Sequence, residues 1–157
     1  MIMDDARQEP PESAIFVFEH QVHDDEIDVL GHVNNLAYLQ WMISAAVAHS
    51  TACGWTTERY LKSGGGWVVR SHKIEYFNSA LANDRITVRT WIAGFKKVTS
   101  LRRYQIVRNS DQTLLAEAET NWAFIGFEHR VPRRIPQEVI DDFHRYQSDL
   151  ESKEPLR

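Results

Sequence analysis

Residues 23–41 (HDDEIDVLGHVNNLAYLQW) bring together residue types that could carry out acyl transfer. Asp28 lies in a polar segment, and Gly31 lets the chain reverse direction without a steric penalty. Asn34 is a good N-cap for a following helix, because its side-chain oxygen can accept a hydrogen bond from a first-turn amide. The sequence therefore predicts a carboxylate close to a helix N-terminus, where unpaired N–H groups favour negative charge. A nucleophile or base beside such an anion-stabilising position is what acyl transfer requires.

A long helix from about residue 35 to residue 52 would position these groups. Gly54 is placed to end it. We interpret Trp41 as a core residue, whereas Tyr38 is a candidate for the wall of an acyl pocket. Apolar residues recur at the three-and-four spacing of a buried helical face, at Leu36, Leu39, Met42, Ile43, Ala46 and Val47.

The pattern of the remaining sequence predicts strands at residues 15–22, 67–77, 85–95, 99–108 and 113–125. It also predicts a short helix at 56–61, followed by a flexible glycine-rich stretch at 63–66, and a final helix that begins at Pro136. Successive strands after one long helix indicate an α+β fold, a five-stranded antiparallel sheet wrapped around a central helix. We expect a mobile tail at 1–13, a single domain at 14–150 that includes the C-terminal helix, and a second tail at 151–157. An edge strand could pair with a second copy of the chain.

Composition narrows the classes of function. The chain has 157 residues and a net charge of −4, which argues against a general nucleic-acid-binding surface. Its single cysteine, Cys53, excludes an internal disulfide framework and a cysteine-based zinc site. No run approaches the roughly 18 apolar residues of a membrane span, and the acidic N-terminus is unlike a signal peptide. We expect a cytoplasmic protein.

The string DVLGHVNN at residues 28–35, followed by Tyr38 and Trp41, resembles the signature of hotdog-fold acyl thioesterases. It is most similar to the 4-hydroxybenzoyl-CoA thioesterase branch, and its HVNN part also resembles plant acyl-ACP thioesterases. The resemblance extends over about residues 15–125. It implies the hotdog fold, a homodimer or homotetramer, and hydrolysis of an acyl-CoA substrate without a metal or other cofactor.

The resemblance also implies roles for individual residues. Asp28 would attack the thioester carbonyl or activate water, the backbone amide of Asn35 would polarise the carbonyl oxygen, and Gly31 would keep the approach to that amide open. Many relatives have Asp-x-Asp where this chain has Glu26 before Asp28. Acyl-ACP thioesterases have asparagine where this chain has Leu30, which favours the CoA-type mechanism with Asp28 as the main catalytic group. His32 is then either catalytic or structural.

Further residues are candidates for substrate binding. Asn34 could contact substrate but is better explained as a cap, and Tyr76 could line the acyl pocket with Tyr38. Lys96, Lys97, Arg102 and Arg103 form the main basic concentration, either a dock for the CoA phosphates or an exposed hairpin end.

Two other groups are predicted to be without a chemical role. His20 and His23 would lie on opposite faces of a strand, which argues against a shared metal ion, and the Cys53 thiol lacks the histidine pattern of a nucleophile. Two alternatives to a thioesterase stay open. One is a hotdog-fold hydratase or dehydratase, and the other is a non-catalytic acyl-CoA-binding module.

Overall fold

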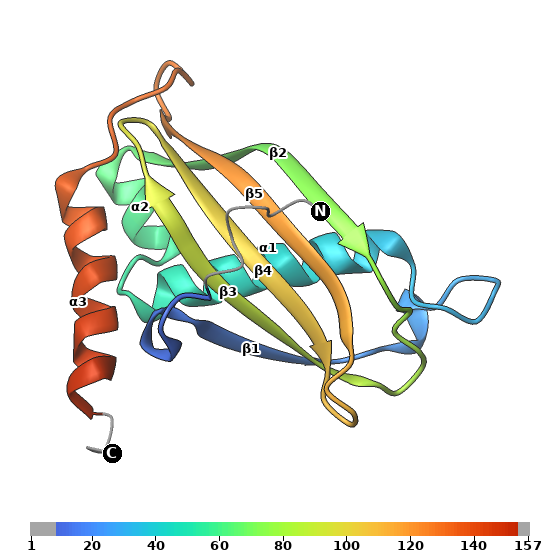
Figure 1. The fold of residues 1–157 in the computed structure, drawn as a ribbon. Helices are drawn as coiled ribbons and strands as arrows, with labels where there is room; N and C mark the ends of the chain where they lie inside the picture. The colour runs from blue at the N-terminus through green and yellow to red at the C-terminus, as the bar shows by residue number, and fades with distance from the viewer. Residues whose placement is uncertain (1–8, 154–157) are drawn as a thin grey trace.

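The computed structural model describes residues 9–153 and has one sheet, one long helix across it and a helix at its end (Figure 1). The strands are β1 (Phe16–Gln21), β2 (Gly65–Tyr76), β3 (Arg85–Phe95), β4 (Thr99–Arg108) and β5 (Leu114–Gly126). The α-helices are α1 (Asn35–Ala52), α2 (Thr57–Ser63) and α3 (Gln137–Lys153). Most of the predicted N-terminal tail lies outside the described residues, as do residues 154–157.

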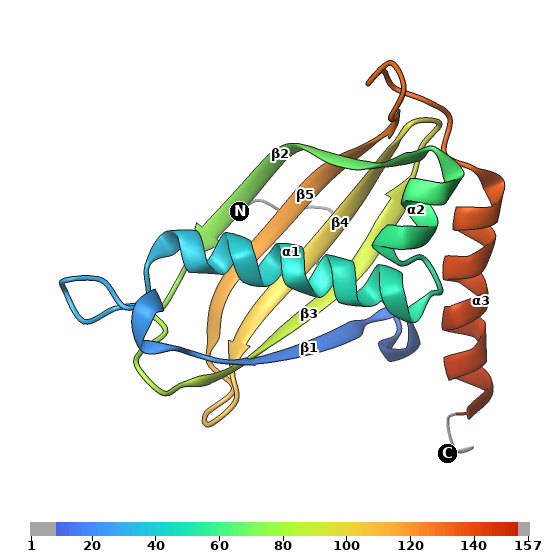
Figure 2. The ribbon, with the colours of Figure 1, turned by 180° about the vertical axis from the view of Figure 1, so that it is seen from behind.

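The five strands form one antiparallel sheet in the order β1-β3-β4-β5-β2. Three hairpin-linked strands occupy the centre, and the strands on either side of α1 in the sequence form the two edges. The sheet curves around α1, which crosses one of its faces (Figure 2). The predicted α+β architecture, a five-stranded sheet around a central helix, is therefore confirmed.

The helix α1 turns a different side to the sheet than its apolar spacing predicted. Its buried residues are Tyr38, Trp41, Met42, Ala45, Ala46 and His49. The prediction is wrong for Leu36 and Val47, whose exposed fractions are 69% and 49%. The helix is apolar on more than one side. Hydrogen bonds made by the polar atoms of two aromatic side chains determine which side is buried. The Tyr38 hydroxyl accepts a hydrogen bond from the N–H of Ala80 at 2.9 Å, and Trp41 Nε1 donates to Glu26 at 2.7 Å.

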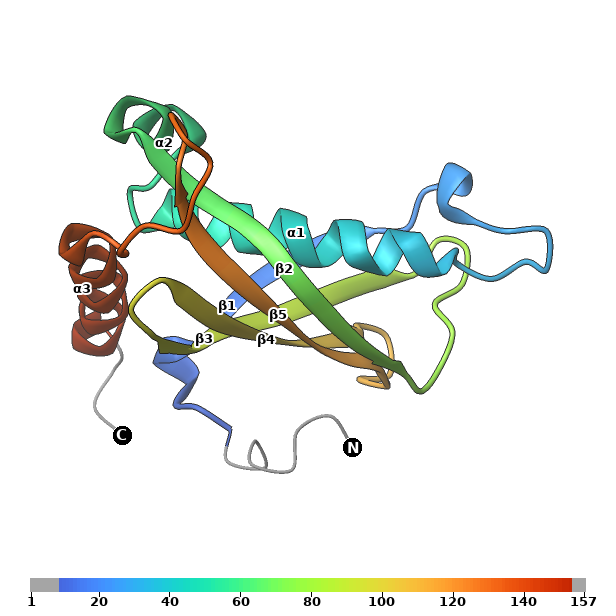
Figure 3. The ribbon, with the colours of Figure 1, turned by 90° about the horizontal axis from the view of Figure 1, so that it is seen from above.

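A second apolar cluster closes the end of the sheet where α1 stops, with α3 standing beside it (Figure 3). Along α3, Val139 and Phe143 are buried, and Ile140 and Tyr146 pack partly against the same cluster. Asp142 is buried there too, and accepts from Trp55 Nε1 at 2.9 Å. No helix within residues 9–153 is long and apolar enough to span a membrane.

Candidate active site

The Asp28 side chain is held in a tight turn that ends just before α1. Its Oδ1 accepts hydrogen bonds from the N–H groups of Leu30 at 2.9 Å and His32 at 3.1 Å. The N–H of Asp28 also donates to the carbonyl of His32 at 2.7 Å. Gly31 has a φ of +81°, a left-handed conformation that glycine adopts without a steric penalty. The turn leaves the carboxylate exposed on a loop that projects beyond the sheet (Figure 3).

The N-terminus of α1 is prepared to receive negative charge. Asn34 Oδ1 accepts from the N–H of Leu36 at 2.8 Å, which confirms the predicted N-cap. Within residues 9–153, no acceptor is found for the N–H of Asn35. The Tyr76 hydroxyl donates to the Asn35 carbonyl at 3.3 Å, so the end of β2 reaches this helix end. A free amide at the positive end of the helix dipole can stabilise an anion.

Glu26 ties the Asp28 loop to the core, a role that sequence reasoning did not assign to it. Its Oε1 accepts from the N–H of His23 at 2.9 Å and lies 2.7 Å from His20 Nε2, while its Oε2 accepts from Trp41 Nε1 at 2.7 Å. The Glu26 carbonyl accepts from the N–H of Asn34 at 2.7 Å. Burial raises the pKa of Glu26, but these hydrogen bonds outweigh burial and hold the pKa below its usual value.

The residues predicted to line a pocket near the Asp28 loop lie in different environments. Tyr38 is a correction to the sequence analysis: it packs in the core with an exposed fraction of 2%, because its hydroxyl is satisfied by the Ala80 N–H. Tyr76 is partly exposed and its ring meets that of Tyr38 edge-on, with centroids 5.1 Å apart. The His32 backbone pairs with Leu81, and no side-chain hydrogen bond of His32 is found among the described residues.

The four basic residues predicted to form one surface lie in three different environments. Lys96 and Lys97 are exposed in the turn between β3 and β4. Arg103 has its Nε 3.7 Å from Glu119. Arg102 is 5% exposed and faces α1, so the prediction that it belongs to an exposed basic surface is wrong. Side chains alternate between the two faces of a strand, and this alternation sends Arg102 and Arg103 to opposite faces.

The basic turn is also far from the Asp28 loop of the same chain. The loop contacts the start of β3 through the pairing of His32 with Leu81, whereas Lys96 follows the end of β3. The strand has 11 residues, and roughly 3.3 Å per residue gives a separation of roughly 35 Å. A role for Lys96 and Lys97 at this site therefore needs a second copy of the chain.

Neither the two histidines nor the cysteine adds a reactive centre. The prediction of opposite faces for His20 and His23 is wrong, because β1 ends at Gln21 and the rings then meet edge-on at 5.2 Å. Within residues 9–153, no three His, Cys, Asp or Glu side chains are grouped as metal ligands would be. Burial raises the pKa of the Cys53 thiol to about 12, which leaves almost no thiolate at neutral pH.

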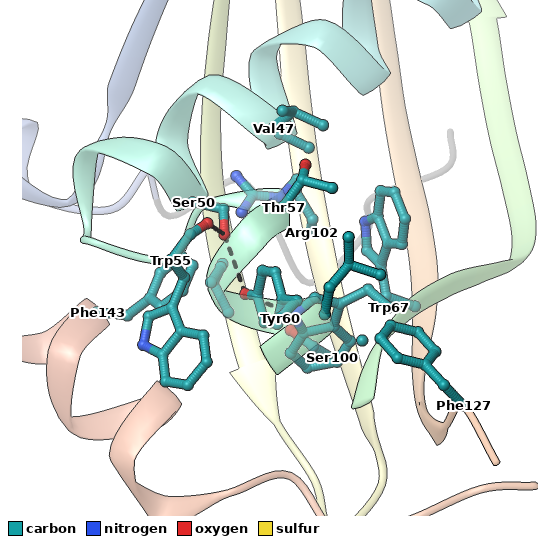
Figure 4. A pocket seen from close by; sticks show the side chains of 15 residues that line it. Val47, Ser50, Trp55, Thr57, Tyr60, Trp67, Ser100, Arg102, Phe127 and Phe143 are labelled. Carbon is teal, nitrogen blue, oxygen red and sulfur yellow. Dashed lines mark hydrogen bonds between the residues drawn. The ribbon is translucent and has the colours of Figure 1, made fainter. Parts of the chain in front are cut away.

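Two cavities lie at the other end of α1, and neither is lined by Asp28 or Asn35. The larger, about 510 Å³, lies between α3 and residues 92–95 of β3. The smaller, about 220 Å³, opens between α1, α2 and the sheet, and aromatic side chains form much of its wall (Figure 4). The Asp28 turn is thus an open site in one chain, with no enclosed pocket of its own among these two.

Comparisons with known proteins show the family and the fold. A family model described as the thioesterase-like superfamily matches residues 22–143. The chain is 24% identical over 131 residues to the acyl-CoA thioester hydrolase YbgC of Escherichia coli, covering 83% of this chain and 97% of the relative. It is 25% identical over 129 residues to the chloroplastic acyl-acyl carrier protein thioesterase ATL2 of Arabidopsis thaliana, covering 82% and 68%. The 1,4-dihydroxy-2-naphthoyl-CoA thioesterase Slr0204 from Synechocystis superposes with a TM-score of 0.77 at 22% identity, covering 83% of this chain and 96% of that one.

Proposed function

The chain belongs to the thioesterase-like superfamily, and we propose that it is an acyl-CoA thioesterase whose catalytic group is Asp28. One observation carries the proposal: a carboxylate clamped by two backbone amides lies in the turn that leads into a helix whose first N–H, on Asn35, has no acceptor among the described residues. The relatives support it, because those compared above are named as thioesterases of CoA or carrier-protein thioesters. Leu30 favours CoA over carrier protein.

In the proposed reaction the thioester carbonyl oxygen rests against the Asn35 N–H. The Asp28 carboxylate attacks the carbonyl carbon or takes a proton from the attacking water. The negative charge that develops on the oxygen is stabilised by the amide and by the helix dipole. If Asp28 attacks directly, CoA leaves as a thiolate and a mixed anhydride on Asp28 remains, which water hydrolyses to the free acid and the regenerated carboxylate. If Asp28 takes a proton from water, the tetrahedral intermediate expels the CoA thiolate and leaves the free acid, and the proton on Asp28 passes to the thiolate or to solvent. Only one side chain does chemistry, because the backbone supplies the oxyanion donor.

The open site is best explained if a second copy covers it, so the proposal includes a homo-oligomer. Val29 and Leu30 at the tip of the Asp28 loop have exposed fractions of 102% and 76%. Strand β2 is an edge of the sheet, and its last residue, Tyr76, reaches the first residue of α1. Pairing along β2 would cover the unpaired strand edge and bring a second copy beside this helix end.

Replacement of Asp28 by asparagine tests the proposal. Asn keeps the hydrogen bonds that Oδ1 accepts but can neither attack nor take a proton. We expect release of free thiol from a panel of short, long and aromatic acyl-CoAs to fall by about 10² or more, with the thermal unfolding midpoint nearly unchanged. Asp25→Asn is the matched control, since Asp25 is an exposed acid three residues earlier in the same loop.

Near-normal turnover by the Asp28→Asn protein would refute the catalytic assignment. The same panel separates the alternatives. Hydration of crotonyl-CoA without thiol release would indicate a hydratase, and saturable acyl-CoA binding without any reaction would indicate a binding module.

A further inference from the structure

The smaller cavity contains a buried positive charge that has no negative partner in the part of the chain that the structure describes. Arg102 projects from β4 into the space between the sheet and the C-terminal part of α1, where it lines the cavity with Ser50, Tyr60 and Trp67 (Figure 4). Its exposed fraction is 5%. We propose that this cavity binds a small carboxylic acid, with the carboxylate on Arg102 and the apolar body against the aromatic wall.

The guanidinium is only partly used by the protein. Arg102 Nη1 donates to His49 Nδ1 at 2.9 Å and to Thr90 Oγ1 at 3.1 Å. A guanidinium has five N–H donors, and the described residues offer no acceptor for those on Nη2 and Nε. Two neighbouring N–H groups of this kind match the two oxygens of a carboxylate.

Among residues 9–153, no buried anion neutralises this charge. The ionisable groups that act on it are the thiol of Cys53 and the phenols of Tyr60 and Tyr104, and burial raises the pKa of each, so all three are neutral at pH 7. The buried carboxylate of this region, Asp142, is instead engaged by Trp55, Arg59 and Arg145.

A purely structural role for Arg102 would be to hold α1 against the sheet. The C-terminal turn of α1 does provide some compensation, because its dipole carries about half a negative charge. A whole buried cation with three unused donors is nevertheless costly to retain for that purpose, since a neutral side chain could bond to His49 and Thr90 equally well. An anionic ligand accounts for both the charge and the unused donors.

The cavity suits a ligand with one ring or a short chain. Its volume is about 220 Å³, whereas an apolar cavity of about 150 Å³ already holds a benzene-sized guest. Three other polar side chains of the wall are linked to one another: Trp67 Nε1 donates to the Tyr60 hydroxyl at 3.0 Å, which lies 2.9 Å from Ser50 Oγ. Val47 and Leu61 line the cavity with exposed fractions of 49% and 63%, so its mouth is open to solvent.

The test compares benzoate with benzamide, which have the same ring but differ in charge. Calorimetric titration of the wild-type chain at pH 7 should give saturable benzoate binding at least about tenfold tighter than benzamide binding. Arg102→Gln should reduce that preference to near one. Arg89→Gln is the matched control, because Arg89 lies on β3 next to β4 and is paired with Glu12 at 3.1 Å. It should bind benzoate as the wild type does.

Equal affinities for benzoate and benzamide, or no saturable binding of benzoate, would overturn the proposal, and neither result needs a variant. Unchanged benzoate preference in a folded Arg102→Gln protein would also overturn it. The Asp28→Asn protein should still bind benzoate, so a failure of this proposal can be distinguished from a failure of the proposed hydrolysis. Competitive inhibition of thiol release by benzoate would show that an acid in this cavity excludes the substrate, and binding without inhibition would show that the cavity binds an acid independently of hydrolysis.

Discussion

Replacement of Glu26 by glutamine should destabilise the protein by about 2–4 kcal/mol at pH 7, although the two side chains have nearly the same shape. The Glu26 carboxylate has three polar neighbours at 2.7–2.9 Å and a side-chain exposed fraction of 16%. Hydrogen bonds to a charged group contribute about 1.5–3 kcal/mol each, and neutral ones about 1 kcal/mol. Glutamine keeps one acceptor oxygen and turns an NH2 group toward one of the donors. The loss therefore combines weakened hydrogen bonds with one donor, Trp41 Nε1 or the His23 N–H, left unsatisfied.

The penalty should also depend on pH in a definite direction. The pKa of Glu26 is lowered in the folded chain, so the carboxylate contributes stability that is present above its unfolded pKa and is lost as pH falls through the folded pKa. Glutamine does not titrate. The difference in unfolding free energy between wild type and variant should therefore be largest near pH 7 and shrink below about pH 4.5, the ordinary pKa of this side chain.

Urea unfolding at a series of pH values measures both effects. Asp25→Asn is the control, because Asp25 lies next to Glu26 in sequence but is exposed. A change below about 0.5 kcal/mol in Glu26→Gln at pH 7 is the usual size for a surface substitution and would refute the anchoring role. A penalty that stays constant down to pH 3 would show that shape, not charge, carries it.

Two further predictions concern groups buried near the end of α1. Burial, together with the charge of Arg102, lowers the pKa of His49 to about 3, so stability present above pH 6.5 should be lost as pH falls toward 3, by at most about 1.4 kcal/mol per pH unit. His49→Gln should remove that component in urea unfolding between pH 7 and 4, and parallel wild-type and variant curves would contradict it. Because burial raises the pKa of Cys53 to about 12, alkylation by iodoacetamide at pH 8 should be at least about 100-fold slower in the native chain than in urea. Equal rates in the two states would show an accessible thiol.

The fold could be predicted because local patterns and global packing agree along most of the chain. The hairpin strands β3 and β4 have the predicted bounds, and the cap at Asn34 is formed as expected. Glycine was harder to interpret. Gly65 and Gly66 were predicted to lie in a flexible stretch but belong to β2. A Cβ added at Gly65 would come within 2.7 Å of the Phe124 ring, and one added at Gly66 within 2.7 Å of the Phe127 ring. Sequence spacing does not reveal such close packing across strands.

The geometry around the candidate site was predictable where it depends on local sequence and not where it depends on which face of an element is buried. The turn from Asp28 to the start of α1 is short, so its residue types almost determine its geometry. For Arg102, an unused signal was present: Tyr104 and Ile106 follow it at a spacing of two, and both are fully buried. Period-two spacing places Arg102 on the same inner face. Because four basic side chains lie close together in the sequence, the prediction was a basic surface instead.

The two ends of α1 would recognise negative charge by different means. At the N-terminus, the backbone amide of Asn35 and the helix dipole favour an anion, so a developing oxyanion needs no cationic side chain. At the C-terminus the helix carbonyls repel an anion, and a carboxylate can be held only if a side chain brings a full positive charge. Arg102 is the side chain placed to do so, beside His49 in the last turn of α1. Anion binding at this end should therefore depend on one residue, whereas oxyanion stabilisation at the other should survive every side-chain substitution that keeps the Asn34 cap and the Gly31 turn.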